Sequence, residues 1–154
     1  RYFPDLVTLI NDAVVGLWPH PAVALEPIAR STDPVERIAF ASEVFLRYVL
    51  AYQGAVRAMI SATITRPGGV PTRPGFRFDW IEYALAPAET TLVSGGSDAI
   101  AQLKRDLAVI VSAEALFTLT DLCGLSPEDA IASAARLATT ITMTALTGGR
   151  APNM

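Results

Sequence analysis

Apolar residues recur at intervals of three and four along six stretches of this chain, and prolines or glycines separate the stretches. Such spacing places apolar side chains on one face of an α-helix. The predicted helices cover residues 5–18, 33–52, 55–65, 79–85, 97–122 and 126–148. The remaining apolar runs, at residue 70 and at 76–78, are too short to build a sheet. The sequence therefore predicts an all-α fold, a bundle of about six helices.

Capping residues mark where several of these helices begin and end. Asp33 precedes Pro34 and Glu36, and Ser126 precedes Pro127 in the same way. Asp and Ser side chains accept hydrogen bonds from the free N–H groups of a first helical turn, where proline is also tolerated. A glycine, Gly124, follows the 97–122 stretch and favours its end. The short connection at 123–125 predicts that the last two helices lie antiparallel.

Composition restricts the classes of function. Hydrophobic residues make up 51% of the chain and charged residues 18%, which excludes a disordered protein. The longest uncharged stretches, 13–25 and 137–149, are shorter than the ~20 residues that span a bilayer, so no membrane partner is predicted. The net charge of −3 means that acidic residues outnumber basic ones, so this chain is not predicted to bind nucleic acid itself. One His and one Cys cannot form a zinc cluster or a Cys/His pair, so we predict no metal, no cofactor and no enzymatic activity.

The expected location is the cytoplasm. Cys123 is the single cysteine and cannot form an internal disulfide, and no secretory signal opens the sequence.

The last predicted helix carries a face composed mainly of alanine. Small side chains allow a second helix to approach closely, near the short end of the usual 8–10 Å spacing. We therefore expect a homodimer in which the last two helices of each subunit form a four-helix bundle across a twofold axis. The predicted interface residues are Leu119, Ile131, Ala134, Ala135, Ala138, Ile141, Thr142 and Ala145. The alternative is that both helices pack only within one subunit.

Three segments resemble the tetracycline-repressor (TetR) family of transcription regulators. Arg1-Tyr2-Phe3-Pro4-Asp5 resembles the end of that family's DNA-recognition helix and the start of its fourth helix. The segment 77–85, with Trp80-Ile81-Glu82, resembles the region before the last two helices, and 113–130 resembles those two helices. The resemblance implies an effector-binding and dimerisation domain that covers residues 1–154 without the N-terminal helix-turn-helix head.

The resemblance also implies how such a protein acts, as a ligand-responsive transcriptional repressor. A small hydrophobic or aromatic effector binds inside the bundle and changes the spacing of two heads, which contact operator DNA about 34–36 Å apart. Arg1 and Tyr2 are expected to touch the DNA backbone weakly. The expected effector-binding residues are Trp18, Phe45, Tyr48, Tyr52, Met59, Trp80, Tyr83, Ile110, Glu114 and Phe117.

Two carboxylates, Glu114 and Asp121, lie seven residues apart on the apolar stripe of the 97–122 helix. A buried carboxylate has to be paired or neutral. Glu114 therefore contacts either a ligand amine or hydroxyl, or one of the arginines at 57, 77 and 105. Asp121 is expected to pair with Arg136 or to lie in an interface.

Two other functions remain open. An all-α dimeric scaffold could bind a protein partner in a groove. An enclosed cavity between the helices would favour the effector-binding hypothesis over this scaffold hypothesis. An enzyme using Glu114 with Tyr48 or Tyr83 is the third alternative, although no nucleophile or metal cluster supports it.

Overall fold

The computed structural model describes residues 9, 15–64, 75–89 and 97–148, and within these ranges it contains helices and no strand, so the fold is all-α. The helical elements are α2 (Pro21–Ala24), η1 (Glu26–Ile28), α3 (Pro34–Ala51), α4 (Gln53–Ile64), α5 (Phe76–Glu89), α6 (Ser97–Ile110), α7 (Ala113–Phe117), η3 (Thr118–Leu122) and α8 (Pro127–Gly148). Most of the predicted 5–18 helix, and Arg1 and Tyr2, for which weak DNA contact was predicted, lie outside the described residues.

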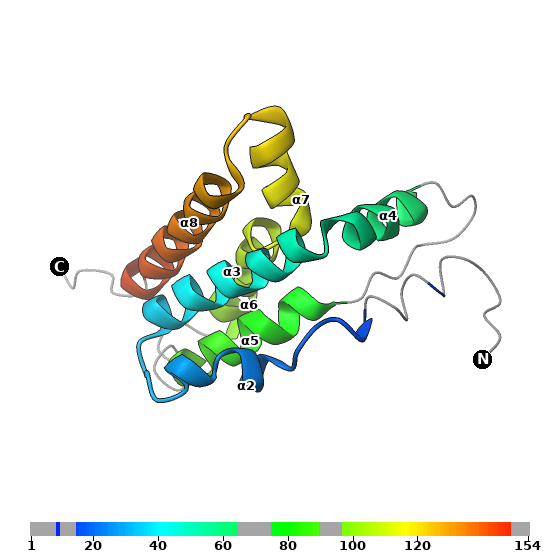
Figure 1. Ribbon diagram of the computed structural model, residues 1–154. Coiled ribbons are helices and arrows are strands. Elements are labelled where there is room, and N and C mark those ends of the chain that lie inside the picture. The colour runs from blue at the N-terminus through cyan, green and yellow to red at the C-terminus, as the bar shows by residue number, and fades with distance from the viewer. Residues whose placement is uncertain (1–8, 10–14, 65–74, 90–96, 149–154) are drawn as a thin grey trace.

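Helix α3 runs through the middle of the molecule (Figure 1). It packs most extensively against α8 and next against α5, while α6 packs against both α8 and α5. The core lies among these four helices and α7 and includes the fully buried side chains of Leu46, Trp80, Leu107, Leu116 and Ile131. Each such aliphatic side chain contributes roughly 1.5–3 kcal/mol by leaving water.

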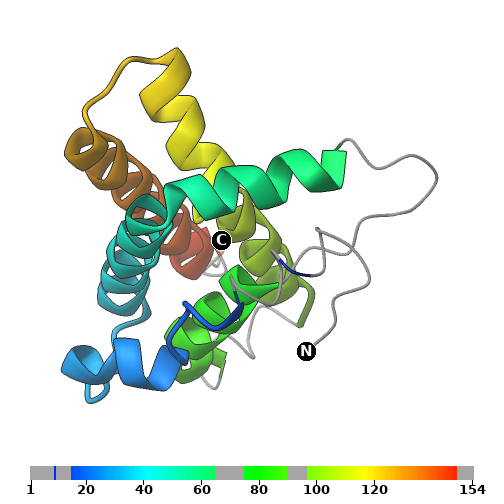
Figure 2. The same ribbon diagram turned by 45° about the vertical axis from the view of Figure 1, so that its right-hand side comes forward.

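The start of α3 confirms the capping prediction, because the Asp33 side chain accepts a hydrogen bond from the Val35 N–H at 2.9 Å and Pro34 occupies the first turn. Helix α3 ends at Ala51 with Tyr52 as its C-cap, and α4 begins at Gln53, close to the gap between the predicted helices 33–52 and 55–65. Figure 2 shows α4 turning sharply away from α3 and extending beyond the other helices. The start of α4 still belongs to the core, since Val56 is 2% exposed, and the neighbouring Arg57 places its guanidinium over the Phe117 ring of α7.

The predicted single helix over 97–122 is wrong. The structure breaks it into α6, α7 and the π-helical segment η3, and α8 is the longest helix within the described ranges. At the break, Ser112 adopts an extended backbone, and its hydroxyl accepts from the Ala115 N–H at 3.0 Å while donating to the Val109 carbonyl at 2.7 Å. The Ser112 side chain thus satisfies a free backbone group on each side of the interruption.

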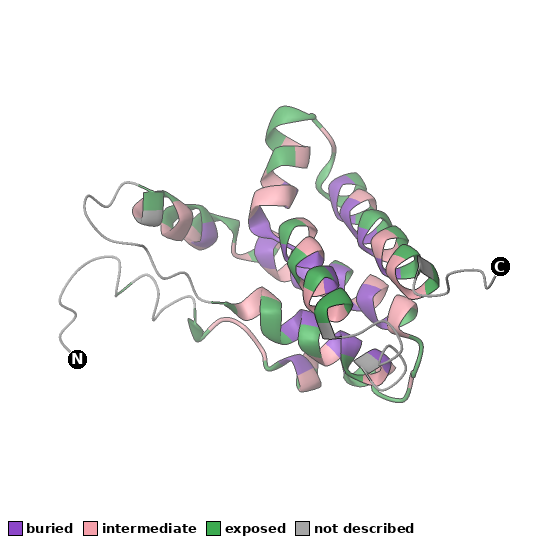
Figure 3. Ribbon diagram, turned by 180° about the vertical axis from the view of Figure 1, so that it is seen from behind, coloured by how far each residue is buried: buried purple, intermediate pink, exposed green. Residues whose placement is uncertain are grey.

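The alanine face of α8 corrects the predicted dimer interface. Five of the assigned residues, Ile131, Ala134, Ala135, Ala138 and Thr142, are at most 5% exposed in the single chain, where α3 and α6 cover this face. Small side chains allow close helix packing here as predicted, but the helix that approaches belongs to the same chain. Leu119, Ile141 and Ala145 are half-buried and also pack against this core. Figure 3 shows the buried and exposed sides of α8 separated along its length.

Helix α5 contains a proline in its interior, which a buried arginine compensates. Pro87 has no N–H to donate to the Tyr83 carbonyl one turn earlier. Arg37, only 4% exposed, donates from Nη2 to that Tyr83 carbonyl at 2.7 Å and from Nε to the Ala84 carbonyl at 3.0 Å. Its Nη1 donates to the Ile28 carbonyl at 3.1 Å. One guanidinium therefore joins α3, α5 and η1.

Candidate functional site: a pocket between α4 and α7

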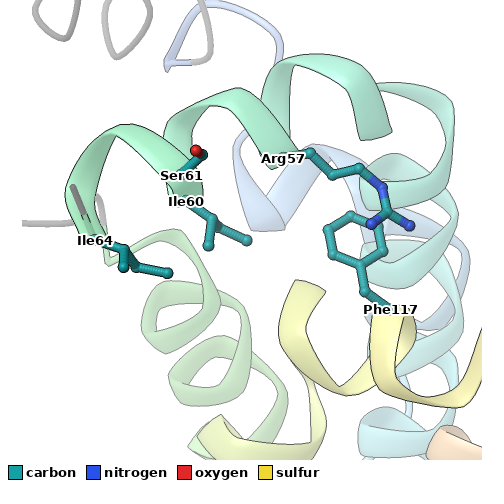
Figure 4. A pocket seen from close by; sticks show the side chains of 5 residues that line it. All are labelled: Arg57, Ile60, Ser61, Ile64 and Phe117. Carbon is teal, nitrogen blue, oxygen red and sulfur yellow. The ribbon is translucent and has the colours of Figure 1, made fainter. Parts of the chain in front are cut away.

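Helix α4 and the end of α7 enclose a pocket of about 300 Å³ that opens to solvent (Figure 4). It is lined by Arg57, Ile60, Ser61, Ile64 and Phe117. The four α4 residues follow one another at steps of three, one and three, which places them on the same face of the helix. Figure 4 shows Ile60 and Ile64 on the pocket side of α4, with the Phe117 ring beside Arg57.

Arg57 connects this pocket to η3, the segment that follows α7. Its guanidinium carbon lies 3.8 Å from the centroid of the Phe117 ring, a cation–π arrangement. Its Nη1 and Nη2 donate to the two carboxylate oxygens of Asp121 at 2.7 and 2.9 Å. The sequence-based pairing of Asp121 with Arg136 is therefore wrong, because Asp121 lies in the π-helical segment η3, which faces α4.

The ion pair changes the acidity of both partners. The hydrogen bonds from Arg57, and then the one from Thr120, hold the pKa of Asp121 below its ordinary value. The hydrogen bond to Asp121 raises the pKa of Arg57. Both side chains are more than 40% exposed, so water weakens their attraction and the pair is a modest link between α4 and η3.

The pocket therefore combines apolar walls with one charged group and one hydroxyl at its edge. Such a composition suits a small apolar molecule that carries a single polar group, and the volume lies at the lower end of the roughly 300–1,000 Å³ usual for ligand sites. Of the ten predicted effector-binding residues, Phe117 lines this pocket. Ile60, Ser61 and Ile64 were not predicted as ligand-binding residues, although their spacing places them with Arg57 on one helical face.

An aromatic cluster in the core contains four other predicted residues together with Phe76. The four are Trp18, Phe45, Tyr48 and Trp80. Ring centroids are 4.9 Å apart for Trp18 and Phe45, and 5.6 Å apart for Phe45 and Trp80. Tyr48 contacts the rings of Trp18 and Trp80 at 6.1 and 6.0 Å. The rings fill the space among themselves, which is how aromatic side chains stabilise a core.

Trp18 has an unmet hydrogen bond within this cluster. Its indole Nε1 is buried, and the described part of the chain offers it no acceptor. A buried N–H without a partner costs free energy, so an acceptor on a bound molecule would be favourable there. Among the predicted effector-binding residues in the cluster, Trp18 thus has the clearest chemical reason for contacting a ligand.

The remaining predicted residues are placed elsewhere. Tyr52, Met59, Tyr83 and Ile110 are half-buried and pack against the core. Of the alternatives left open for Glu114, the ion pair with Arg77 is present, with Nη2 and Oε2 3.1 Å apart. Glu114 lines a different depression from Phe117. The structure therefore does not gather the ten residues into one site.

Within the described ranges, no three His, Cys, Asp or Glu side chains are grouped so as to hold a metal ion. The helices in those ranges also include none with the length and apolar character needed to cross a bilayer. Comparisons with protein-family models, with curated proteins and with solved structures each return no match to this chain.

Proposed function

We propose that this chain is the effector-binding domain of a TetR-type transcription regulator and that its effector is a small apolar molecule bound between α4 and α7. The observation that carries this proposal is the pocket lined by Arg57, Ile60, Ser61, Ile64 and Phe117. The all-helical fold and the three segments that resemble the family support it.

The position of α4 suggests how binding could be transmitted. Among the described elements, α4 contacts mainly α3, and its link to η3 is the exposed Arg57–Asp121 pair. A molecule between Ile60 and Phe117 would add contacts that exist in only one arrangement of α4 relative to α7. A ligand shifts an equilibrium by its differential affinity for the two states. Coupling between sites is typically about 1–3 kcal/mol, which corresponds to roughly 5–150-fold in affinity.

In this proposal, DNA contact belongs to a helix-turn-helix segment that precedes residue 1 in the polypeptide. Two such heads on a homodimer enter successive major grooves about 34–36 Å apart. Effector binding changes that spacing and weakens the operator complex. Repression is relieved because the liganded dimer no longer matches both half-sites.

Titration with the neutral fluorophore N-phenylnaphthylamine tests the pocket. We expect saturable binding by the wild type and a loss of roughly tenfold or more in Ile60→Trp, because the indole fills the space between Ile60 and Phe117. Ala58→Trp is the matched control, since Ala58 is exposed and is not among the residues lining this pocket. Equal binding by Ile60→Trp and the wild type would contradict this location for the effector.

A module that binds a protein partner is the second candidate. It is favoured by the openness of the pocket to solvent, since an effector pocket in a bundle is commonly more enclosed. Absence of saturable binding of the fluorophore to the wild type would favour this alternative.

A further inference from the structure

A second depression lies between α5, α6 and the start of α7. Its volume is about 440 Å³, and its wall includes Arg77, Phe78, Arg105, Ala108, Val109 and Glu114. Glu114 lies at the beginning of α7, whereas Phe117 of the first pocket lies at its end. The two depressions share no lining residue, so this is a separate site.

The charges around this depression do not cancel. Arg77 is held in place, because its Nη2 pairs with Glu114 at 3.1 Å and its Nη1 donates to the Ala108 carbonyl at 3.1 Å. Arg105 is exposed, and its Nη1 donates to the Gln102 side-chain oxygen at 3.3 Å. No ion pair joins Arg105 to a carboxylate within the described ranges. Two guanidiniums and one carboxylate therefore leave one positive charge on the lining.

Apolar surface lies beside this charge. Phe78 is 46% exposed and Val109 is 72% exposed, and both line the depression. Covering them would remove apolar area from water, which is favourable. A ligand that matches the wall therefore needs an apolar body for Phe78 and Val109 and an anionic group for Arg105.

We infer that this depression binds a small aromatic anion, such as an aryl carboxylate or aryl sulfonate. The planar guanidinium of Arg105 donates two parallel hydrogen bonds to the anionic group, a geometry that arginine favours. The ring lies against Phe78 and Val109. An uncharged ring lacks the partner for Arg105, and a cation is repelled by it. This site is additional to the effector pocket proposed between α4 and α7.

Anilinonaphthalene sulfonate, an aromatic anion, is the probe for this site, and fluorescence titration at low ionic strength gives its dissociation constant. We expect saturable binding by the wild type, weakened roughly fivefold in Arg105→Gln by loss of the charge-assisted bonds. Arg136→Gln is the matched control, because Arg136 is also exposed and bonds to the residue three positions earlier, Ser133, at 3.4 Å. Val109→Asp should weaken binding further by placing a like charge on the wall. Val109 is exposed, so this change leaves the fold intact.

Four outcomes would overturn the inference. The first is the absence of saturable sulfonate binding. The second is unchanged affinity in Arg105→Gln, and the third is an equal loss in Arg136→Gln, which would indicate a general charge effect. The fourth is a loss of sulfonate binding in Ile60→Trp with none in Val109→Asp, which would place the anion in the α4–α7 pocket. N-phenylnaphthylamine is uncharged and tests the α4–α7 pocket through Ile60→Trp, whereas the sulfonate tests this depression through Arg105→Gln, so the failure of one proposal can be distinguished from the failure of the other.

Discussion

At the scale of single residues, the role of Arg37 as a buried hydrogen-bond donor to α5 could not be predicted from the sequence. It is a charged residue between Glu36 and Ile38, and nothing in its surroundings marks it as buried. Its function depends on Pro87, fifty positions later, which leaves the Tyr83 carbonyl without a helical donor. Sequence periodicity describes one helix at a time and therefore cannot reveal a donor supplied by another helix.

Arg37→Met should lower the free energy of unfolding by about 3 kcal/mol, because the part-buried carbonyl of Tyr83 and the buried carbonyl of Ala84 lose a charged donor. In a Pro87→Ala background the cost should be about 1 kcal/mol smaller, since the restored backbone N–H bonds to the Tyr83 carbonyl. Urea unfolding of the single and double variants measures this coupling, with Arg30→Met as an exposed control. Equal costs in both backgrounds would show that Arg37 does not compensate for the proline.

At the scale of elements, the sequence predicts where helices start more reliably than where they are interrupted. Asp33 caps α3 as predicted, and the Asp129 N–H donates to Ser126 at 3.2 Å at the start of α8. The break at Ser112 was not predicted, because the apolar period continues through it without glycine or proline. Glu114 and Asp121 therefore do not share one helical stripe. Each pairs with an arginine from a different helix, Arg77 of α5 and Arg57 of α4.

Ser112→Ala should destabilise the protein by about 1 kcal/mol, the usual cost of losing an N-cap side chain. The backbone N–H of Ala115 loses its acceptor, and the Val109 carbonyl loses a donor. Chemical denaturation with Ser133→Ala as the control gives the difference, because Ser133 lies within α8 and does not cap a helix. A control variant as unstable as Ser112→Ala would contradict a special role for the cap.

Two bidentate ion pairs link elements and predict sensitivity to acid. Arg57 lowers the pKa of Asp121 from 3.8, and Arg47 lowers the pKa of Glu128 from 4.5. Because both values are lower in the folded state, the pairs stabilise the protein above these ordinary values, and that contribution is lost as the pH falls through the lowered ones.

The thermal unfolding midpoint of the wild type should therefore decrease as the pH is lowered below about 4.5. In an Asp121→Asn, Glu128→Gln double variant this decrease should be less steep. Salt at about 1 M should reduce the difference between the wild type and the double variant, since both pairs are exposed. An identical pH dependence in the two proteins would assign the acid sensitivity to other carboxylates.

At the scale of the whole molecule, the helical period of the sequence was enough to predict the all-α class. It was not enough to predict what each helical face packs against. The alanine face of α8 predicts close packing with some helix, and the sequence contains nothing that says whether that helix belongs to the same chain. The core aromatic residues raise the same difficulty, because Phe45 and Trp80 have the character of a ligand site and instead pack against each other. A homodimer, which we still propose, must therefore use surface that the single chain leaves open.

The outward side of α8 offers such surface, since Leu137 and Met143 are 50% and 46% exposed. Sedimentation equilibrium should give twice the 16.4 kDa mass of the chain, and Leu137→Glu with Met143→Glu should restore the single-chain mass. Helical circular dichroism should be unchanged, because both side chains point away from the core that Ala138 and Thr142 fill. Val23→Glu is the control, since Val23 is 71% exposed on α2 and should leave the dimer intact. A wild type that sediments as a single chain at every concentration would reject the homodimer, whereas a dimer unaffected by the double substitution would move its interface to another face.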